Sequence, residues 1–93
     1  MTKTKAKHVS LKLWTWLSEH PGEDKSAYPG FEEIKKYPSY CALCALFLNY
    51  GCRGCPLGHC MSNHKSPYYM WYNNHFNMDA AREILQKIKE WKV

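Results

Sequence analysis

The sequence predicts a small, mostly α-helical single domain, in which three to four short helices surround a cysteine-rich loop. Three observations support this fold class. Apolar residues recur at helical spacing near both ends of the chain, and no segment shows the alternation of apolar and polar residues typical of a strand. All five cysteines lie between Cys41 and Cys60. A length of 93 residues suits one domain rather than two.

The first eight residues are polar and basic, and we expect residues 1–8 to form a flexible tail ahead of a domain spanning residues 9–93. From Val9 onward the pattern is helical, because apolar residues such as Leu13 and Leu17 follow at intervals of four. Pro21-Gly22 ends this first predicted helix.

The middle of the chain combines a loop with a short apolar segment. Residues 23–40 contain prolines and glycine and predict a loop, with one short turn around Phe31 and Ile34. Residues 41–50 are apolar, lack proline and are followed by Gly51, a pattern that predicts a third helical segment.

Two helices are predicted in the last third of the chain. Ser66 and Pro67 form a helix start, with the serine as N-cap and the proline at the first helical position, and that helix should end near Asn73-Asn74. Asn77 should cap the last helix. Its apolar stripe is Ala81, Ile84, Leu85, Ile88 and Trp91, opposite Lys87, Lys89 and Glu90.

The cysteine spacing predicts a metal site. Cys41 and Cys44 are separated by two residues, as are Cys52 and Cys55, and two such pairs supply the four tetrahedral thiolate ligands that Zn²⁺ prefers. Gly54 and Gly58 should let the backbone bend closely around the ion. Small domains commonly need a metal or a disulfide framework, and an odd, crowded set of cysteines favours the metal.

The sequence leaves alternatives for the residues that bind the metal. Cys60 is an alternative ligand that could replace Cys52, and His59 or His64 could also substitute for a thiolate. An iron–sulfur cluster is also held by four cysteines. Because a full thiolate set closes the coordination sphere, we expect one structural Zn²⁺ rather than a catalytic one, and no enzymatic activity.

The large number of aromatic residues has two interpretations. Four Trp, seven Tyr and three Phe are enough to build a core and leave some rings over. Core packing is the simpler interpretation for most of them. The sharper hypothesis is that Tyr68, Tyr69, Trp71 and Tyr72 form an exposed patch that binds a partner.

The charge and the N-terminus bear on partners and location. The formal net charge is +5, and four thiolates with one Zn²⁺ would lower it by two, to +3. This mild excess, with Lys3, Lys5 and Lys7 near the start, permits nucleic-acid binding without requiring it.

The basic N-terminal residues are not followed by an apolar run, and no apolar segment is long enough to span a bilayer. We therefore expect a cytoplasmic protein without a membrane partner.

The order of these motifs resembles the small, cysteine-rich, zinc-finger-like proteins encoded by tailed bacteriophages and prophages. The likeness runs from about Leu13 to Trp91. Its motifs are the segments 13–17 and 20–22, the two cysteine pairs with Cys60 behind them, the segment 66–71, and the helix from Ala80 to Leu85. This group is largely uncharacterised, so the resemblance implies a life in the cytosol of an infected bacterium but supplies no catalytic residues.

The function expected from the sequence is therefore a zinc-stabilised binding module that docks on a host or phage protein. The absence of a recognisable catalytic constellation and the surplus of aromatic residues favour this interpretation. A nucleic-acid-binding zinc protein is the alternative, because the chain is basic.

Overall fold

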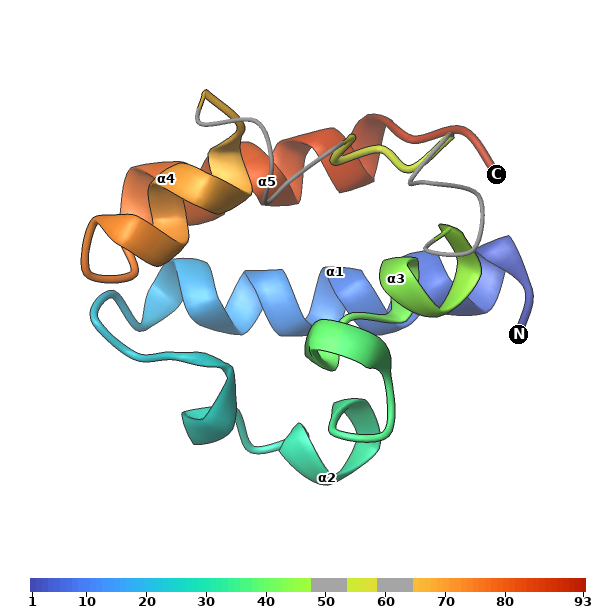
Figure 1. Ribbon diagram of the computed structural model, residues 1–93, viewed down its shortest axis with the longest axis horizontal. Helices are drawn as coiled ribbons and strands as arrows, with labels where there is room; N and C mark the ends of the chain where they lie inside the picture. The colour runs from blue at the N-terminus through green and yellow to red at the C-terminus, as the bar shows by residue number, and fades with distance from the viewer. Residues whose placement is uncertain (48–53, 59–64) are drawn as a thin grey trace.

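The computed structural model describes residues 1–47, 54–58 and 65–93 and consists of helices and short helical turns in these ranges (Figure 1). In chain order the elements are α1 (Lys3–Glu19), η1 (Lys25–Ala27), α2 (Phe31–Ile34), η2 (Pro38–Tyr40), α3 (Ala42–Phe47), α4 (Pro67–Asn73) and α5 (Met78–Glu90). The mostly helical class predicted from the sequence is confirmed for the described residues.

Helix α1 crosses the molecule and organises the packing. It lies against α5 and α3, and α4 packs against α5 (Figure 1). The buried face of α1 includes Val9, Leu13 and Leu17, as the helical spacing predicts. On α5 the buried residues are Ala80, Ala81, Ile84 and Ile88. These two apolar faces form the centre of the core.

The beginning of α1 differs from the sequence prediction. Residues 1–8 were expected to be a flexible tail, but the helix begins at Lys3, where the Thr2 side chain accepts a hydrogen bond from the Lys5 backbone N–H. Ala6 is fully buried. The Lys7 ammonium donates to the carbonyl oxygens of residues 89 and 91 at the end of α5, at 3.2 and 2.5 Å. The basic residues therefore continue the helix because its first turns pack against the far end of the chain.

An aromatic cluster joins α1 to α4. The Trp14 ring meets Trp71 and Tyr68 edge-on, with ring centroids 4.9 and 5.8 Å apart. Trp14 and Trp71 are both fully buried, and their indole N–H groups have no hydrogen-bond partner among the described residues. The apolar area of the two rings must therefore outweigh the cost of two buried polar groups.

The segment between α1 and α3 is a chain of short turns rather than a featureless loop. The turn predicted around Phe31 and Ile34 is present as α2, and Ile34 is fully buried. The 3₁₀ turns η1 and η2 flank it. In η1, Asp24 accepts a hydrogen bond from the Ser26 backbone N–H at 2.9 Å. The buried Ile34 ties this segment to the core.

Helices α4 and α5 begin at the residues that the sequence predicts. The caps of α4 and α5 are Ser66 and Asn77, which accept backbone N–H bonds from Tyr69 and Ala80. Helix α3 confirms residues 42–47 of the predicted segment, and residues 48–50 lie outside the described residues. On α5, Lys87 and Lys89 are exposed as expected, whereas Leu85 and Trp91 are only partly buried.

No described helix has both the length and the apolar character needed to cross a membrane.

Candidate metal centre

The first cysteine pair lies at the beginning of α3, facing α1. Cys41 precedes the helix in an extended conformation, and its carbonyl oxygen accepts the Ala45 backbone N–H at 3.3 Å. Cys41 is buried and Cys44, one turn further on, is partly buried. Cys41 therefore occupies the N-cap position of α3, the place that Ser66 and Asn77 occupy in α4 and α5.

The environment of the Cys41 sulfur favours a thiolate. The pKa of Cys41 is lowered from 9.0 to about 6, chiefly because the side chain of Cys44 forms a hydrogen bond with it. Burial acts in the opposite direction and raises the pKa. The positive charge of Lys25 and the backbone N–H groups of Cys44 and Leu43 lower it further. A thiolate is the form in which cysteine binds metal, so this thiol pair has the chemistry of half a zinc site.

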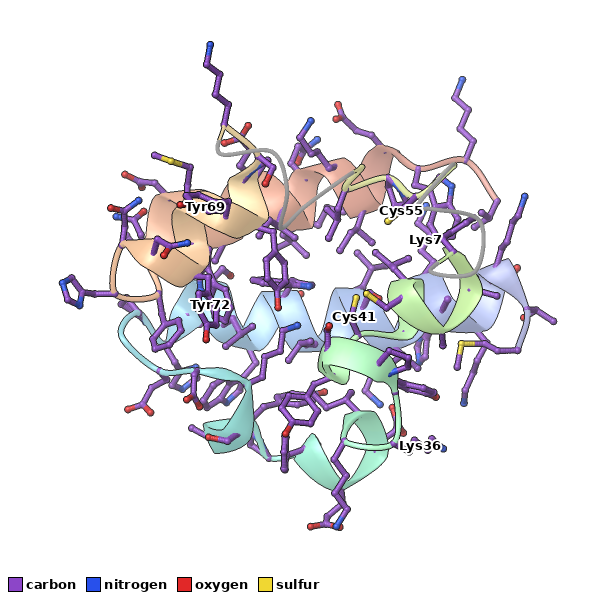
Figure 2. The ribbon with its side chains drawn as sticks, in the orientation of Figure 1. Lys7, Lys36, Cys41, Cys55, Tyr69 and Tyr72 are labelled. Atoms are coloured by element: carbon purple, nitrogen blue, oxygen red, sulfur yellow. The ribbon has the colours of Figure 1, made fainter. Side chains whose placement is uncertain are left out.

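The third described cysteine lies on a tight turn above α3. The backbone N–H of Gly58 donates to the carbonyl oxygen of Cys55 at 3.0 Å, which closes the turn. Leu57 anchors it in the core. Gly54 and Gly58 have φ angles of 83° and 64°, a conformation that glycine adopts without strain. That the backbone bends here around a metal ion stays a prediction. Figure 2 shows Cys41 at the start of α3 and Cys55 on a separate segment of the backbone.

The complete ligand set predicted from the sequence extends beyond what the structure describes. Cys52 and the alternative ligands Cys60, His59 and His64 fall in residues 48–53 and 59–64, outside the described residues. Within the described ranges, no three or more His, Cys, Asp or Glu residues come together as a metal-binding group. Among the described residues the structure thus brings together Cys41 and Cys44, and Cys55 does not join them in a group of three.

The chemistry of the donors present fits a soft divalent ion. Two thiols two residues apart, already in hydrogen-bond contact and supported by backbone N–H donors, match the way one half of a tetrathiolate zinc site is built. Cys41 and Cys44 would hold the ion together with Cys55 and either Cys52 or Cys60. Zinc bound there would act structurally, by joining the start of α3 to the turn that carries Cys55.

Sequence reasoning missed one residue beside this pair. Lys25 is only 5% exposed, and its ammonium donates to the Ser39 carbonyl oxygen at 2.9 Å and to the Tyr68 hydroxyl at 2.7 Å. A lysine in a polar, proline-containing loop is ordinarily solvated. Nothing in the local sequence marks Lys25 as buried, because its partners lie 14 and 43 positions further along the chain.

The structure corrects the proposed four-residue aromatic patch. Tyr68 and Trp71 are 7% and 1% exposed and belong to the core, whereas Tyr72 is 54% exposed and Tyr69 is partly buried. The reason is helical spacing: residues three apart share a face, so Tyr68 and Trp71 turn inward together and Tyr69 and Tyr72 turn away. Only the outer pair remains available to a partner.

Comparison with protein-family models, curated proteins and solved structures finds no match for this chain.

Proposed function

We propose that this chain is a zinc-stabilised binding module that docks on another protein, and that it is encoded by a bacteriophage or prophage and acts in the bacterial cytoplasm. The observation that carries the metal part is the Cys41–Cys44 thiol pair at the start of α3, with its hydrogen bond and lowered pKa. The phage origin rests on the motif order alone. The module binds rather than catalyses, and a zinc ion closed by four thiolates offers no position to a substrate.

Zinc would give the cysteine segment the stability that its short elements lack. Six residues of helix α3 are described, and an isolated helix of that length is unstable in water. The segment 54–58 is a turn held in the core by Leu57. A metal ion shared by these two segments would bind only the folded chain, so its binding free energy would stabilise the fold directly.

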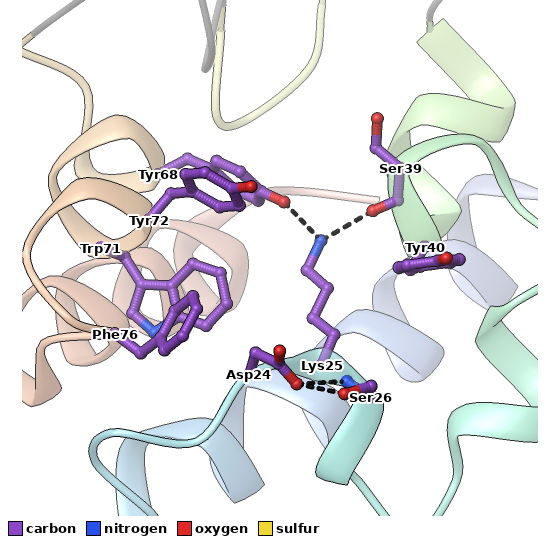
Figure 3. A pocket seen from close by; sticks show the side chains of 9 residues that line it. All are labelled: Asp24, Lys25, Ser26, Ser39, Tyr40, Tyr68, Trp71, Tyr72 and Phe76. Carbon is purple, nitrogen blue, oxygen red and sulfur yellow. Dashed lines mark hydrogen bonds between the residues drawn. The ribbon is translucent and has the colours of Figure 1, made fainter.

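The surface that we propose for docking is the outer side of α4. Tyr72 is 54% exposed there, and Tyr40 on η2, which lines the same pocket as Tyr72, is 44% exposed (Figure 3). Large exposed apolar and aromatic side chains supply most of the energy in protein interfaces when they become buried. This surface replaces the four-residue patch suggested by the sequence.

Nucleic-acid binding is the second candidate function. Of the three N-terminal lysines that favour it, one has a structural role in the fold. Lys7 donates to two carbonyl oxygens at the end of α5. Lys3 and Lys5 are exposed and could contact phosphates. A protein that neutralises several phosphates loses affinity steeply as salt rises, whereas binding through Tyr72 and Tyr40 should change little with salt.

The two candidates can be separated by one set of binding measurements. Zinc-loaded protein would be used as bait in a bacterial lysate with and without nuclease treatment, at two salt concentrations, beside Tyr72→Ala and Lys5→Met variants. Docking through α4 predicts that capture of a defined protein persists at high salt and is lost in Tyr72→Ala but not in Lys5→Met. Capture that depends on nucleic acid, falls with salt and is weakened by Lys5→Met would refute protein docking and favour the second candidate.

A further inference from the structure

The packing of α1 against α5 brings the first and last residues of the chain to one end of the molecule. The Lys7 ammonium donates to the carbonyl oxygens of Lys89 and Trp91, which lie 82 and 84 positions further along the chain. Figure 1 accordingly shows both termini on the same side of the fold. Charges at the start of α1 and at the end of α5 therefore belong to one surface.

This surface, which we call the basic end, is formed by the first turns of α1, the last turn of α5 and the residues after α5. It carries six lysines, of which five are exposed and Lys7 is partly exposed. The acidic residue in the described stretches 1–18 and 84–93 is Glu90. Even the two negative charges of a tetrathiolate zinc site would leave this end positive. The six lysines are Lys3, Lys5, Lys7, Lys87, Lys89 and Lys92.

Carboxylates gather at the opposite end of the same two helices. Asp79 and Glu83 lie in the first turns of α5, and Glu19 is the last residue of α1. The Gly22 backbone N–H donates to the Phe76 carbonyl oxygen at 3.2 Å, which places the end of α1 beside the start of α5. The charge of the chain is therefore divided between its two ends, and the net charge of +5 understates how basic one of them is.

The fold itself explains only some of the lysines at the basic end. Lys87 and Lys89 lie in the last turn of α5, where a positive charge is favourable beside the helix dipole. Lys3 and Lys5 lie in the first turn of α1, where the dipole makes a positive charge unfavourable, and that turn has no acidic residue to offset them. Both side chains are exposed. Their placement suits a negatively charged partner better than it suits the helix.

The composition of the basic end favours a nucleic-acid backbone over a protein as that partner. All six of its cations are lysines. Lysine is depleted in protein interfaces, where arginine and aromatic residues are enriched. Lysine binds phosphate as a point charge, whereas arginine supplies most of the bidentate contacts that read base edges. A surface with lysines alone therefore suits phosphate oxygens that are contacted without regard to sequence.

The rings of the described residues favour a duplex over a single strand. Proteins that bind single strands stack the bases on exposed aromatic side chains. Tyr40 and Tyr72, the exposed tyrosines of the described residues, line the pocket beside α4 instead. At the basic end, Trp91 is partly buried and its ring packs against Phe47, with ring centroids 5.8 Å apart. A duplex keeps its bases stacked and needs no such platform.

From these features we propose that the basic end binds the phosphate backbone of a nucleic-acid duplex without reading its sequence. Lysines from α1 and from the end of the chain contact the phosphates together, so this surface exists only in the folded protein. The contact goes beyond docking through Tyr72 and Tyr40, because it uses a different surface, and it does not depend on that proposed function.

Fluorescence anisotropy of the intact chain with labelled DNA duplexes of two unrelated sequences tests the proposal. We expect equal affinities, with a Kd of about 10⁻⁴–10⁻⁶ M at physiological salt. The slope of log K against log salt should be about −2.7 to −4.5, since each phosphate contact contributes about −0.9 and three to five lysines take part. No binding at low salt, or a strong preference for one sequence, would overturn the proposal.

Two further probes separate the sources of negative charge. An RNA duplex of the same length shows which backbone binds more tightly, and saturable binding of either duplex supports the proposal. Polyglutamate of equal charge represents an acidic protein surface and should compete only weakly. If polyglutamate binds more tightly than both duplexes, the basic end recognises an acidic protein and the proposal is wrong.

Two double variants with the same loss of charge locate the surface. Lys5→Gln with Lys92→Gln removes one charge from each end of the chain and should reduce the salt slope by about two. Lys35→Gln with Lys36→Gln removes the same charge beside α2 (Figure 2), and should leave the slope unchanged. All four positions are exposed. Tyr72→Ala should bind duplex like the unmodified protein, so failure of protein docking and failure of this proposal are distinguishable. Equal effects of the two double variants would refute the assignment.

Discussion

Helices α4 and α5 begin with an oxygen-bearing cap, whereas α3 begins with a sulfur-bearing one. Ser66 and Asn77 accept a backbone N–H in the first turn of α4 and α5. At the start of α3, the Cys41 sulfur interacts with the backbone N–H groups of Leu43 and Cys44. In α3 one side chain therefore serves as both helix cap and predicted metal ligand, so we expect metal binding and the start of the helix to be coupled.

The two regions also differ in what holds them in place. Helices α1 and α5 bury continuous apolar faces against each other, and α4 adds the Trp14–Trp71 contact. Helix α3 buries Ala42, Leu43 and Phe47 beside α1, and among the described residues of the turn that carries Cys55 only Leu57 is buried. Packing alone therefore accounts for the placement of α1, α4 and α5, whereas the cysteine segment is where we expect a bound metal ion to add to the stability of the whole domain.

Removing the metal should have the largest effect. A strong chelator under reducing conditions should abolish much of the helical circular dichroism signal, because structural zinc contributes about 10–16 kcal/mol of apparent binding free energy in zinc-finger peptides. Returning zinc should restore the signal. A chelated, metal-free chain that keeps its helicity and melts cooperatively would show that the packed frame is sufficient without the cysteine segment.

A substitution in the frame should have the next largest effect. Ile84→Ala removes a fully buried side chain from α5 and should lower the free energy of unfolding by about 2–5 kcal/mol in urea titration of the zinc-loaded protein. Leu85→Ala on the same helix is the matched control, and it should cost less because Leu85 is only partly buried. Equal losses for the two variants would contradict the packing described for α5.

Removing an oxygen-bearing cap should cost less than either change. Asn77→Ala deletes the acceptor for the Ala80 backbone N–H and should destabilise the protein by about 1 kcal/mol without loss of metal. The unfolding midpoint and the zinc content would be measured on the same sample. Release of zinc from this variant would show that the two regions are coupled more tightly than their separate caps imply.

The smallest predicted effect concerns Lys7. Lys7→Met removes the ammonium that donates to two carbonyl oxygens at the end of α5, and should cost about 0.3–1 kcal/mol because the Lys7 side chain is partly exposed. Lys5→Met is the control, since the Lys5 side chain is exposed. If both variants unfold at the same urea concentration, the contact between the two ends of the chain does not contribute to stability.

Much of the helical frame could be predicted from the sequence because its signals are local. Ser66, Pro67 and Asn77 mark helix starts, and the stripe on α5 shows its own buried face. The start of α1 was missed because burial of Ala6 and the role of Lys7 depend on α5, more than 80 residues away. The burial of Tyr68 and Trp71 could have been predicted, since their spacing of three places them on one helical face.

The candidate sites differ in the same respect, namely whether a local sequence pattern indicates them. Spacing alone placed Cys41 and Cys44 together, and the structure confirms that these two side chains meet. The pocket lined by Tyr40 and Tyr72 had no sequence signal, because it is assembled from three segments and rests on left-handed residues that are not glycine. Local patterns reveal a site contained within one helical turn, and they do not reveal one that the tertiary fold creates.

The most direct test of the central claim is the metal content of freshly purified, reduced protein and of its Cys41→Ser variant. Serine can still cap α3 through its hydroxyl, but it cannot replace a thiolate ligand, so the variant separates the two roles of Cys41. The account predicts about one zinc per chain in the unmodified protein and a large loss of zinc in Cys41→Ser. An unmodified protein without zinc, or a Cys41→Ser variant that keeps its full zinc content, would contradict it.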